Sequence, residues 1–265
     1  MIQTLDGENK SLILRSNHAS KEFLAKLQHM RQQDQFTDVI LTTEDGKQVK
    51  AHKIVLCCSS NYFEVMFCGQ FCENPQSEIH LKEIFYNPLN QIIDYFYTGI
   101  LKITLDNCQE LLQLSDLLLL SETKKHILKY FRQTLNTTNC ILYQRIGQMY
   151  CDGDLSEASQ KFFSRNYEIV CESEDFKDLT FEELCDFYTH FGNSIIVQSE
   201  DIVLKSIVLW IQHEKKIREN YVKELSRFVH WNQVSGETFE TFKQNYPTGI
   251  LSGLVVLCSF IYKKT

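Results

Sequence analysis

The chain has 265 residues, 43% of them hydrophobic, and its 27 Lys and Arg against 34 Asp and Glu give a net charge of −7 at pH 7. This composition is that of a globular chain, excludes collagen-like repeats and disorder, and allows one large domain or two modest ones. The chain has only 10 Gly and 3 Pro residues, about half the usual share, which favours helices over a turn-rich all-β fold.

The acidic charge argues against nucleic-acid binding, because neutralising phosphates requires clustered Lys or Arg and no basic run exceeds two residues. The ten cysteines occur in a chain large enough to fold without disulfides, and no signal peptide opens the sequence. We therefore expect reduced thiols in the cytoplasm or nucleus. The longest apolar stretch, 250–262, is interrupted and too short for a bilayer, so no membrane segment is expected.

The first 18 residues have no regular period and predict a mobile arm. In the following segment, 19–33, Phe23, Leu27 and Met30 are spaced i, i+4 and i+7 and form one narrow apolar stripe on a predicted helix. A stripe this narrow requires a partner surface.

Strand signals follow. The run 36–41, a turn at Asp45-Gly46 and the run 47–51 predict a hairpin, since Asp-Gly supplies the positive φ values of a tight turn. A helical segment is expected at 54–67, a third strand at 79–81 and a small strand at 100–104. Helices are expected to start at Asn87-Pro88, with Gly99 as terminator, at a capping box of Asp106 with Gln109, and at Ser121.

Beyond residue 133 the strand signals stop and amphipathic helices continue to about residue 246. Thr180 with Glu183 predicts a capping box, and Ser199 predicts the start of another helix. Trp210 and Trp231 are interpreted as anchors of helix packing. The sequence therefore predicts an α+β domain with a small sheet followed by an all-α domain.

No catalytic motif is present: the hydrolase elbow, the Walker loop, the dinucleotide-binding turn and the H-E-x-x-H helix are all absent. Cys68, Cys72 and His80 form a loose cluster, but it lacks an adjacent fourth ligand and a C-x2-C pair. We expect no catalytic residue, no metal and no cofactor. The pair Cys57-Cys58 is interpreted as small core filling, since a vicinal disulfide would strain the backbone.

Two titratable residues stand out. His52 directly follows the hairpin, and a partly buried histidine hydrogen-bonded in a structural corner is the favoured interpretation. Asp38 lies within an apolar strand pattern, where a carboxylate is costly unless paired, so it predicts a partner in the fold or in a second subunit.

Order, spacing and residue types in the first half resemble the signature of BTB/POZ domains. The matching segments are Phe36-Thr-Asp38-Val39, Ala51-His52-Lys53, Ser60-Asn-Tyr62-Phe63, Met66-Phe67 and Tyr95-Phe96-Tyr97-Thr98-Gly99. The second half is similar to the BACK domain of Kelch-like proteins through Asn139-Cys140, Glu174-Asp-Phe176, Ser199-Glu200 and Trp210-Ile-Gln-His213. On this resemblance the arm spans 1–18, a BTB/POZ domain 19–133, a BACK domain 134–246 and a C-terminal tail 247–265.

The resemblance implies a dimeric, non-enzymatic substrate adaptor of a cullin-3 ubiquitin ligase. Members that bind cullin carry a hydrophobic-x-Glu motif, which Phe71-Cys72-Glu73 fits. The implied cullin-binding residues are Tyr62, Phe63, Met66, Phe71 and Glu73, and the implied dimer interface comprises Phe23, Leu27, Met30, Asp38 and His52. The implied partners are the cullin-3 N-terminal domain, a second copy or another BTB protein, and an unidentified client.

The tail resembles the first strand of a Kelch repeat, with Cys258-Ser259 in place of paired glycines. One strand cannot form a propeller blade, which leaves two alternatives: a piece of a longer protein, or a protein that recruits its client by other means. A second hypothesis for function is therefore a scaffold or competitor that dimerises with Kelch-like proteins, or organises cytoskeletal or transcriptional complexes, without ubiquitination.

Overall fold

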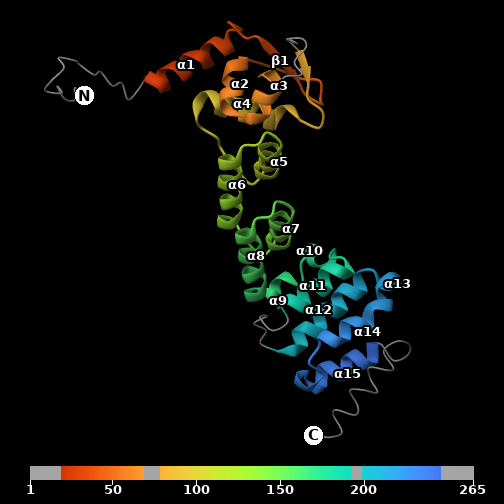
Figure 1. The fold of residues 1–265 in the computed structure, drawn as a ribbon. Coiled ribbons are helices and arrows are strands. Elements are labelled where there is room, and N and C mark those ends of the chain that lie inside the picture. The colour runs from red at the N-terminus through yellow and green to blue at the C-terminus, as the bar shows by residue number, and fades with distance from the viewer. Residues whose placement is uncertain (1–18, 69–77, 192–198, 246–265) are drawn as a thin grey trace, which may run out of the picture. The chain divides into compact units, whose positions relative to one another are not determined.

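The computed structural model describes residues 19–68, 78–191 and 199–245 (Figure 1). The chain divides between Tyr130 and Phe131 into two compact units. The first contains the sheet and several helices, and the described part of the second is helical. This agrees with the predicted α+β domain followed by an all-α domain. The predicted N-terminal arm and C-terminal tail lie outside the described residues.

A three-stranded sheet of β1 (Val39–Thr42), β2 (Gln48–Ala51) and β3 (Glu78–His80) has the order β2-β1-β3. The antiparallel pair β1 and β2 is the predicted hairpin, and its turn uses a positive φ of 73° at Gly46, whose N–H donates to the Thr43 carbonyl. The third strand pairs parallel with β1. Hairpin and third strand are both confirmed.

The helices of the first unit are α1 (Ala19–Gln32), α2 (Lys53–Ser59), α3 (Asn61–Cys68), α4 (Tyr86–Thr98), α5 (Cys108–Leu117) and the start of α6 (Ser121–Gln133). The single helical segment expected at 54–67 is two helices, because Ser60 adopts an extended conformation with φ −150°. The Ser60 hydroxyl donates to the Leu118 carbonyl at 2.8 Å. Gly99 ends α4 in the left-handed conformation, as predicted.

Two local predictions in this unit are wrong. Residues 100–104 form no strand. The helix expected from a capping box at Asp106 begins instead after Asn107, whose side-chain oxygen accepts from the Thr104 N–H at 2.8 Å. An Asx side chain that bonds locally in this way competes with the box geometry.

Apolar side chains from the sheet and from α2 to α5 form the core of the first unit. Its fully buried members, together with Ile127 of α6, are Leu41, Ala51, Leu56, Phe63, Leu89, Ile92, Ile93, Leu111, Leu112 and Leu118.

The second unit contains the end of α6, then α7 (Cys140–Met149), α8 (Gly153–Arg165), α9 (Tyr167–Val170), α10 (Glu174–Lys177), α11 (Phe181–Phe191), α12 (Glu200–His213), α13 (Lys215–Arg218), η1 (Glu219–Tyr221), α14 (Val222–Leu225), η2 (Ser226–Phe228), η3 (Trp231–Gln233) and α15 (Gly236–Asn245).

The capping box of α11 is reciprocal, as predicted. The Thr180 N–H donates to Glu183 at 2.9 Å, and the Glu183 N–H donates to the Thr180 hydroxyl at 3.2 Å. Arg145 of α7 makes a bidentate contact to the same carboxylate at 2.7 and 2.8 Å, which lowers the pKa of Glu183. Ser199 caps α12 by accepting from the Asp201 N–H, also as predicted.

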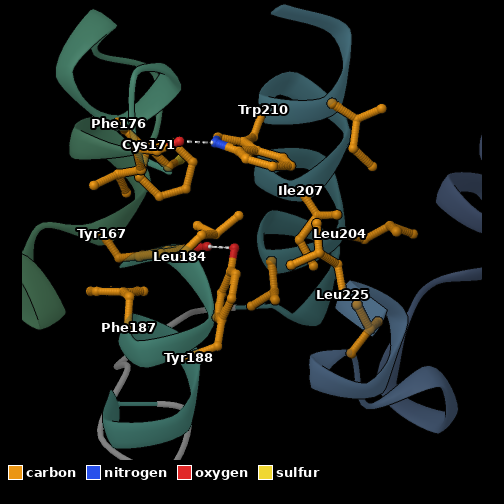
Figure 2. Packing of buried hydrophobic residues seen from close by; sticks show 14 of the residues in the cluster. Tyr167, Cys171, Phe176, Leu184, Phe187, Tyr188, Leu204, Ile207, Trp210 and Leu225 are labelled. Atoms are coloured by element: carbon orange, nitrogen blue, oxygen red, sulfur yellow. Dashed lines mark hydrogen bonds between the residues drawn. The ribbon is translucent and has the colours of Figure 1, made fainter. Parts of the chain in front are cut away.

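The core of the second unit gathers around Trp210, and Figure 2 shows part of it. The indole N–H of Trp210 donates to the Leu179 carbonyl at 2.8 Å, and the Arg218 guanidinium stacks 4.1 Å from the ring centroid. Tyr167 and Tyr188 join their hydroxyls at 2.8 Å, and burial raises the pKa of both. Trp210 is 1% exposed and Trp231 packs against the same core, which confirms both tryptophans as packing anchors.

Helices α7 and α8 approach closely at Gly147. A Cβ built there would lie 2.5 Å from the Ser156 hydroxyl oxygen and 2.8 Å from the Ser156 backbone nitrogen. We expect Gly147→Ala to lower the free energy of unfolding by about 1–3 kcal/mol, because the helices must separate to admit the methyl group. Urea denaturation would measure this. In the control Gly153→Ala the new Cβ meets nothing within 4 Å, and an equal loss in both variants would contradict the steric explanation.

Candidate protein-interaction surfaces

Arg31 holds α1 against the first unit. Its side chain is 10% exposed, and the guanidinium contacts Asp94 at 2.7 Å and Asn90 at 3.0 Å. The same group donates to the Lys50 carbonyl at 2.9 Å and lies 5.2 Å from the Tyr97 ring centroid. No sequence pattern indicated this residue, because its partners lie far along the chain. Arg31 therefore fixes the helix that carries the predicted apolar stripe.

The stripe on α1 is only partly covered. Phe23 is 64% exposed, and Leu27 and Met30 are half-buried. The unit thus presents an apolar helix face that its described residues, 19–68 and 78–130, leave partly open. This is the property expected of a surface that packs against another chain.

We expect Arg31→Ala to lower the free energy of unfolding by about 1.5–3 kcal/mol, because Asp94 and the Lys50 carbonyl lose a charged donor. Thermal unfolding followed by circular dichroism checks this. Lys26→Ala, at an exposed position of the same helix, serves as the control and should change stability by less than about 0.5 kcal/mol. Equal behaviour of the two variants would mean that Arg31 does not anchor α1.

His52 is buried, with 4% of its surface exposed, and is bonded on both ring nitrogens. Nε2 lies 3.0 Å from the Gln35 carbonyl, and Nδ1 lies 2.8 Å from the Tyr97 hydroxyl, which also accepts from the His52 backbone N–H at 2.9 Å. Since a carbonyl can only accept, Nε2 carries the proton and Nδ1 accepts from Tyr97. This confirms the hydrogen-bonded structural corner. The place of His52 at a dimer interface stays a prediction.

Burial raises the pKa of Tyr97, so its hydroxyl stays protonated and can donate a hydrogen bond to Nδ1 of His52. We expect Tyr97→Phe to lower the free energy of unfolding by about 1–3 kcal/mol, because two buried groups of His52 lose their partner. Chemical denaturation of the variant measures the loss. Tyr95→Phe, which removes a hydroxyl from a half-buried neighbour on α4, is the comparison. No loss in Tyr97→Phe would contradict the assigned network.

The expectation that Asp38 is buried within a strand is wrong. Asp38 is exposed and lies one residue before β1. Its carboxylate accepts from the Lys53 backbone N–H at 2.7 Å, in the first turn of α2, where free N–H groups favour an anionic acceptor. The predicted partner is therefore a backbone group of the fold. Its place at a dimer interface stays a prediction.

The second surface lies on α2 and α3. Tyr62 and Met66 are half-buried, whereas Phe63 is 0% exposed and stacks on Phe67 with ring centroids 6.0 Å apart. Phe63 thus positions α3 from inside the unit, and its predicted contact with a partner stays a prediction. The predicted contacts Phe71 and Glu73 lie outside the described residues.

Two apolar residues of this surface were missed in the sequence. Ile54 on α2 is 66% exposed and Val65 on α3 is 71% exposed. Both fall off the buried period of their helices, marked by Val55, Leu56 and Phe63. That mismatch was the available signal. The α2–α3 surface denotes Ile54, Tyr62, Val65 and Met66.

The cysteines of α2 differ from the predicted core filling. Cys57 is half-buried and Cys58 is exposed. Within residues 19–68, 78–191 and 199–245, no group of three His, Cys, Asp or Glu side chains is arranged to hold a metal ion. Cys72 of the loose cluster lies outside these ranges. Over the same residues, no helix is both long and apolar enough to cross a bilayer.

Comparison with known proteins shows which domain families the chain matches. The BTB/POZ domain profile matches residues 27–135, and the profile described as BTB And C-terminal Kelch matches residues 140–244. Human Kelch-like protein 2 is 28% identical over 212 residues, which are 80% of this chain and 35% of that protein. Mouse Kelch-like protein 28 is 32% identical over 210 residues, 79% of this chain and 36% of that protein.

A solved structure, the BTB domain of zebrafish PATZ1, is 28% identical, with a TM-score of 0.42, and covers 47% of this chain and 100% of that structure. The chain spans about a third of the length of the Kelch-like relatives that it matches. The two profiles follow one another in the same order as in the expected architecture. The chain therefore contains a BTB/POZ domain followed by a BACK domain and is a homologue of the Kelch-like proteins.

Proposed function

We propose that the chain is a dimeric adaptor that binds the N-terminal region of cullin-3 through the α2–α3 surface and thereby recruits a client for ubiquitination. The observation that carries this proposal is the exposure of apolar side chains on α2 and α3 of a BTB domain: Ile54 at 66% and Val65 at 71%. Apolar residues exposed together on neighbouring helices favour a protein partner over solvent. The hydrophobic-x-Glu match at Phe71 and Glu73 supports the same partner.

Dimerisation is assigned to α1. Phe23 is largely exposed, and Leu27 and Met30 are half-buried, so a second copy could cover the stripe. In a two-fold dimer each protomer presents the same patch, so one helix face serves both sides of the contact. The anchoring of α1 by Arg31 holds that face in place before the second chain arrives.

Light scattering of the purified chain, alone and mixed with the cullin-3 N-terminal domain, tests both parts. We expect a dimer of about twice the chain mass of 31.1 kDa, shifting to a two-to-two complex with cullin. A dimer that does not bind cullin would favour the scaffold or competitor alternative. A monomer would contradict the assignment of the α1 stripe.

A reconstituted ubiquitination reaction tests the adaptor role itself. A candidate client bound by the chain should be modified in the presence of cullin-3 and its RING partner. Cullin binding with no modification of any bound client would support the competitor alternative instead. The substitution Phe71→Ala with Glu73→Ala should weaken cullin binding if the sequence motif is used, and an unchanged titration would mean that this motif is not part of the site.

A further inference from the structure

Two thiols meet between α2 and α3. Cys57 lies in α2 and Cys68 is the last residue of α3, and their sulfur atoms are 4.0 Å apart. Cys68 is exposed and Cys57 is half-buried. Among the cysteines that the structure describes, this is the pair whose sulfurs contact each other. The contact joins two helices that are separated in sequence by Ser60 alone.

The two sulfurs are in contact but lie beyond bonding distance. A disulfide requires an S–S distance of about 2.05 Å, so the sulfurs must approach by about 2 Å. Side-chain rotation supplies part of this movement, and a shift of Cys68 supplies the rest. Cys68 ends α3, and helix ends adapt more readily than helix interiors.

The two sulfurs have different environments. Burial, followed by the contact with Cys68, raises the pKa of Cys57 to about 11. The Cys57 thiol is therefore protonated at neutral pH, and it also lies 3.7 Å from the Phe63 carbonyl oxygen as a donor. Cys68 is the sulfur open to solvent and hence the one that a dissolved oxidant reaches first.

We propose that Cys57 and Cys68 form a reversible disulfide when the protein meets hydrogen peroxide, and that this bond weakens cullin binding at the α2–α3 surface. Peroxide oxidises the Cys68 thiol to a sulfenic acid and is reduced to one water. The Cys57 sulfur then attacks the Cys68 sulfur, the S–S bond forms, and the hydroxyl group leaves with the Cys57 proton as a second water. Two thiols and one peroxide thus give one disulfide and two waters.

The neighbouring Cys58 is a poorer disulfide partner for Cys57 than Cys68 is. It is exposed, but a bond to Cys57 would join adjacent residues and strain the backbone. Cys58 therefore provides the matched control: it is a thiol on the same helix, next to Cys57, without a sulfur contact in the described structure.

The effect on cullin binding rests on the function proposed above. Met66 lies two residues before Cys68 on the same helix, and Tyr62 lies one turn further back. Drawing the end of α3 toward α2 displaces the side chains that the partner would contact. Because interface complementarity is lost with displacements of about 1 Å, oxidation should weaken the complex.

Peptide mapping by mass spectrometry tests the bond itself in the full chain. After treatment with hydrogen peroxide we expect a cross-linked peptide containing Cys57 and Cys68 that dithiothreitol removes. The variants Cys57→Ser and Cys68→Ser should not form it, whereas Cys58→Ser should. Linkage of Cys68 to Cys58 or Cys72 instead, or oxidation of Cys68 without a cross-link, would overturn the proposal. Because Cys68 is exposed, Cys68→Ser keeps the test valid if Cys57→Ser fails to fold.

Titration of cullin-3 N-terminal domain against reduced and oxidised protein tests the regulation. We expect at least tenfold weaker binding after oxidation, restored by dithiothreitol and absent in Cys68→Ser. Unchanged affinity with the disulfide present would overturn the regulatory half. If the reduced protein did not bind cullin at all, the proposed function and the regulatory half would both fall, while a mapped disulfide would stand by itself.

Discussion

Replacing Tyr62 and Met66 together by alanine should weaken the binding of cullin-3 by at least about 30-fold, which corresponds to about 2 kcal/mol. Both side chains are half-buried, so they are held by the fold while part of each stays open to a partner. Side chains of this kind are typical of interface hot spots, because little conformational freedom is lost on binding. Isothermal titration calorimetry with the cullin-3 N-terminal domain measures the effect.

The control for this prediction is Ile217→Ala in α13 of the second unit. Ile217 is 61% exposed, so the variant removes an exposed apolar side chain that is not part of the α2–α3 surface. It should bind cullin with unchanged affinity. The oligomeric state must be verified for every variant by light scattering. A double variant that keeps the fold and oligomeric state of the parent, and binds as tightly, would remove Tyr62 and Met66 from the site.

Single substitutions at Ile54 and Val65 extend the test to residues that the sequence did not indicate. Ile54→Asp and Val65→Asp place a charge at positions that are already exposed, so the fold should tolerate them. A partner that buries either side chain would lose affinity, since an unpaired charge is costly to desolvate. Binding that is sensitive to both would place the partner across α2 and α3.

The substitution Trp210→Ala should destabilise the second unit by about 3–5 kcal/mol. The side chain is 1% exposed and belongs to the buried cluster of which Figure 2 shows part. Its loss leaves a cavity and removes the donor to the Leu179 carbonyl. It also removes the aromatic ring on which the Arg218 guanidinium stacks. Arg218 is itself 7% exposed, so its charge would remain buried with fewer partners.

Tryptophan fluorescence gives this experiment an internal reporter. The chain has two tryptophans, Trp210 and Trp231, and both belong to the second unit. In Trp210→Ala the remaining signal comes from Trp231, which packs against Phe239 and Phe242. The midpoint of urea unfolding, followed by the fluorescence of Trp231, should shift to a lower urea concentration. The exposed control Ile217→Ala should stay within about 0.5 kcal/mol of the parent, and an equal midpoint in both variants would contradict the assigned role.

Local sequence signals predicted the elements that depend on a few neighbouring residues. Gly46 and Gly99 adopt positive φ where a turn and a helix end require it, because glycine lacks the Cβ that opposes this conformation. Thr180 with Glu183 forms the capping box, since both partners lie within one helical turn. The pattern of strands, then helices, predicted the two classes of unit.

Tertiary structure alone decided which residues are buried, bonded or exposed. The sequence pattern placed Asp38 in a strand interior, yet Asp38 is exposed, and only the structure shows that Phe63 is 0% exposed. Arg31 anchors α1 through Lys50 and Asp94, and Cys57 meets Cys68. Hydrophobic period and cap chemistry act over four residues or fewer, whereas these contacts join helices and strands that are brought together only when the core is packed.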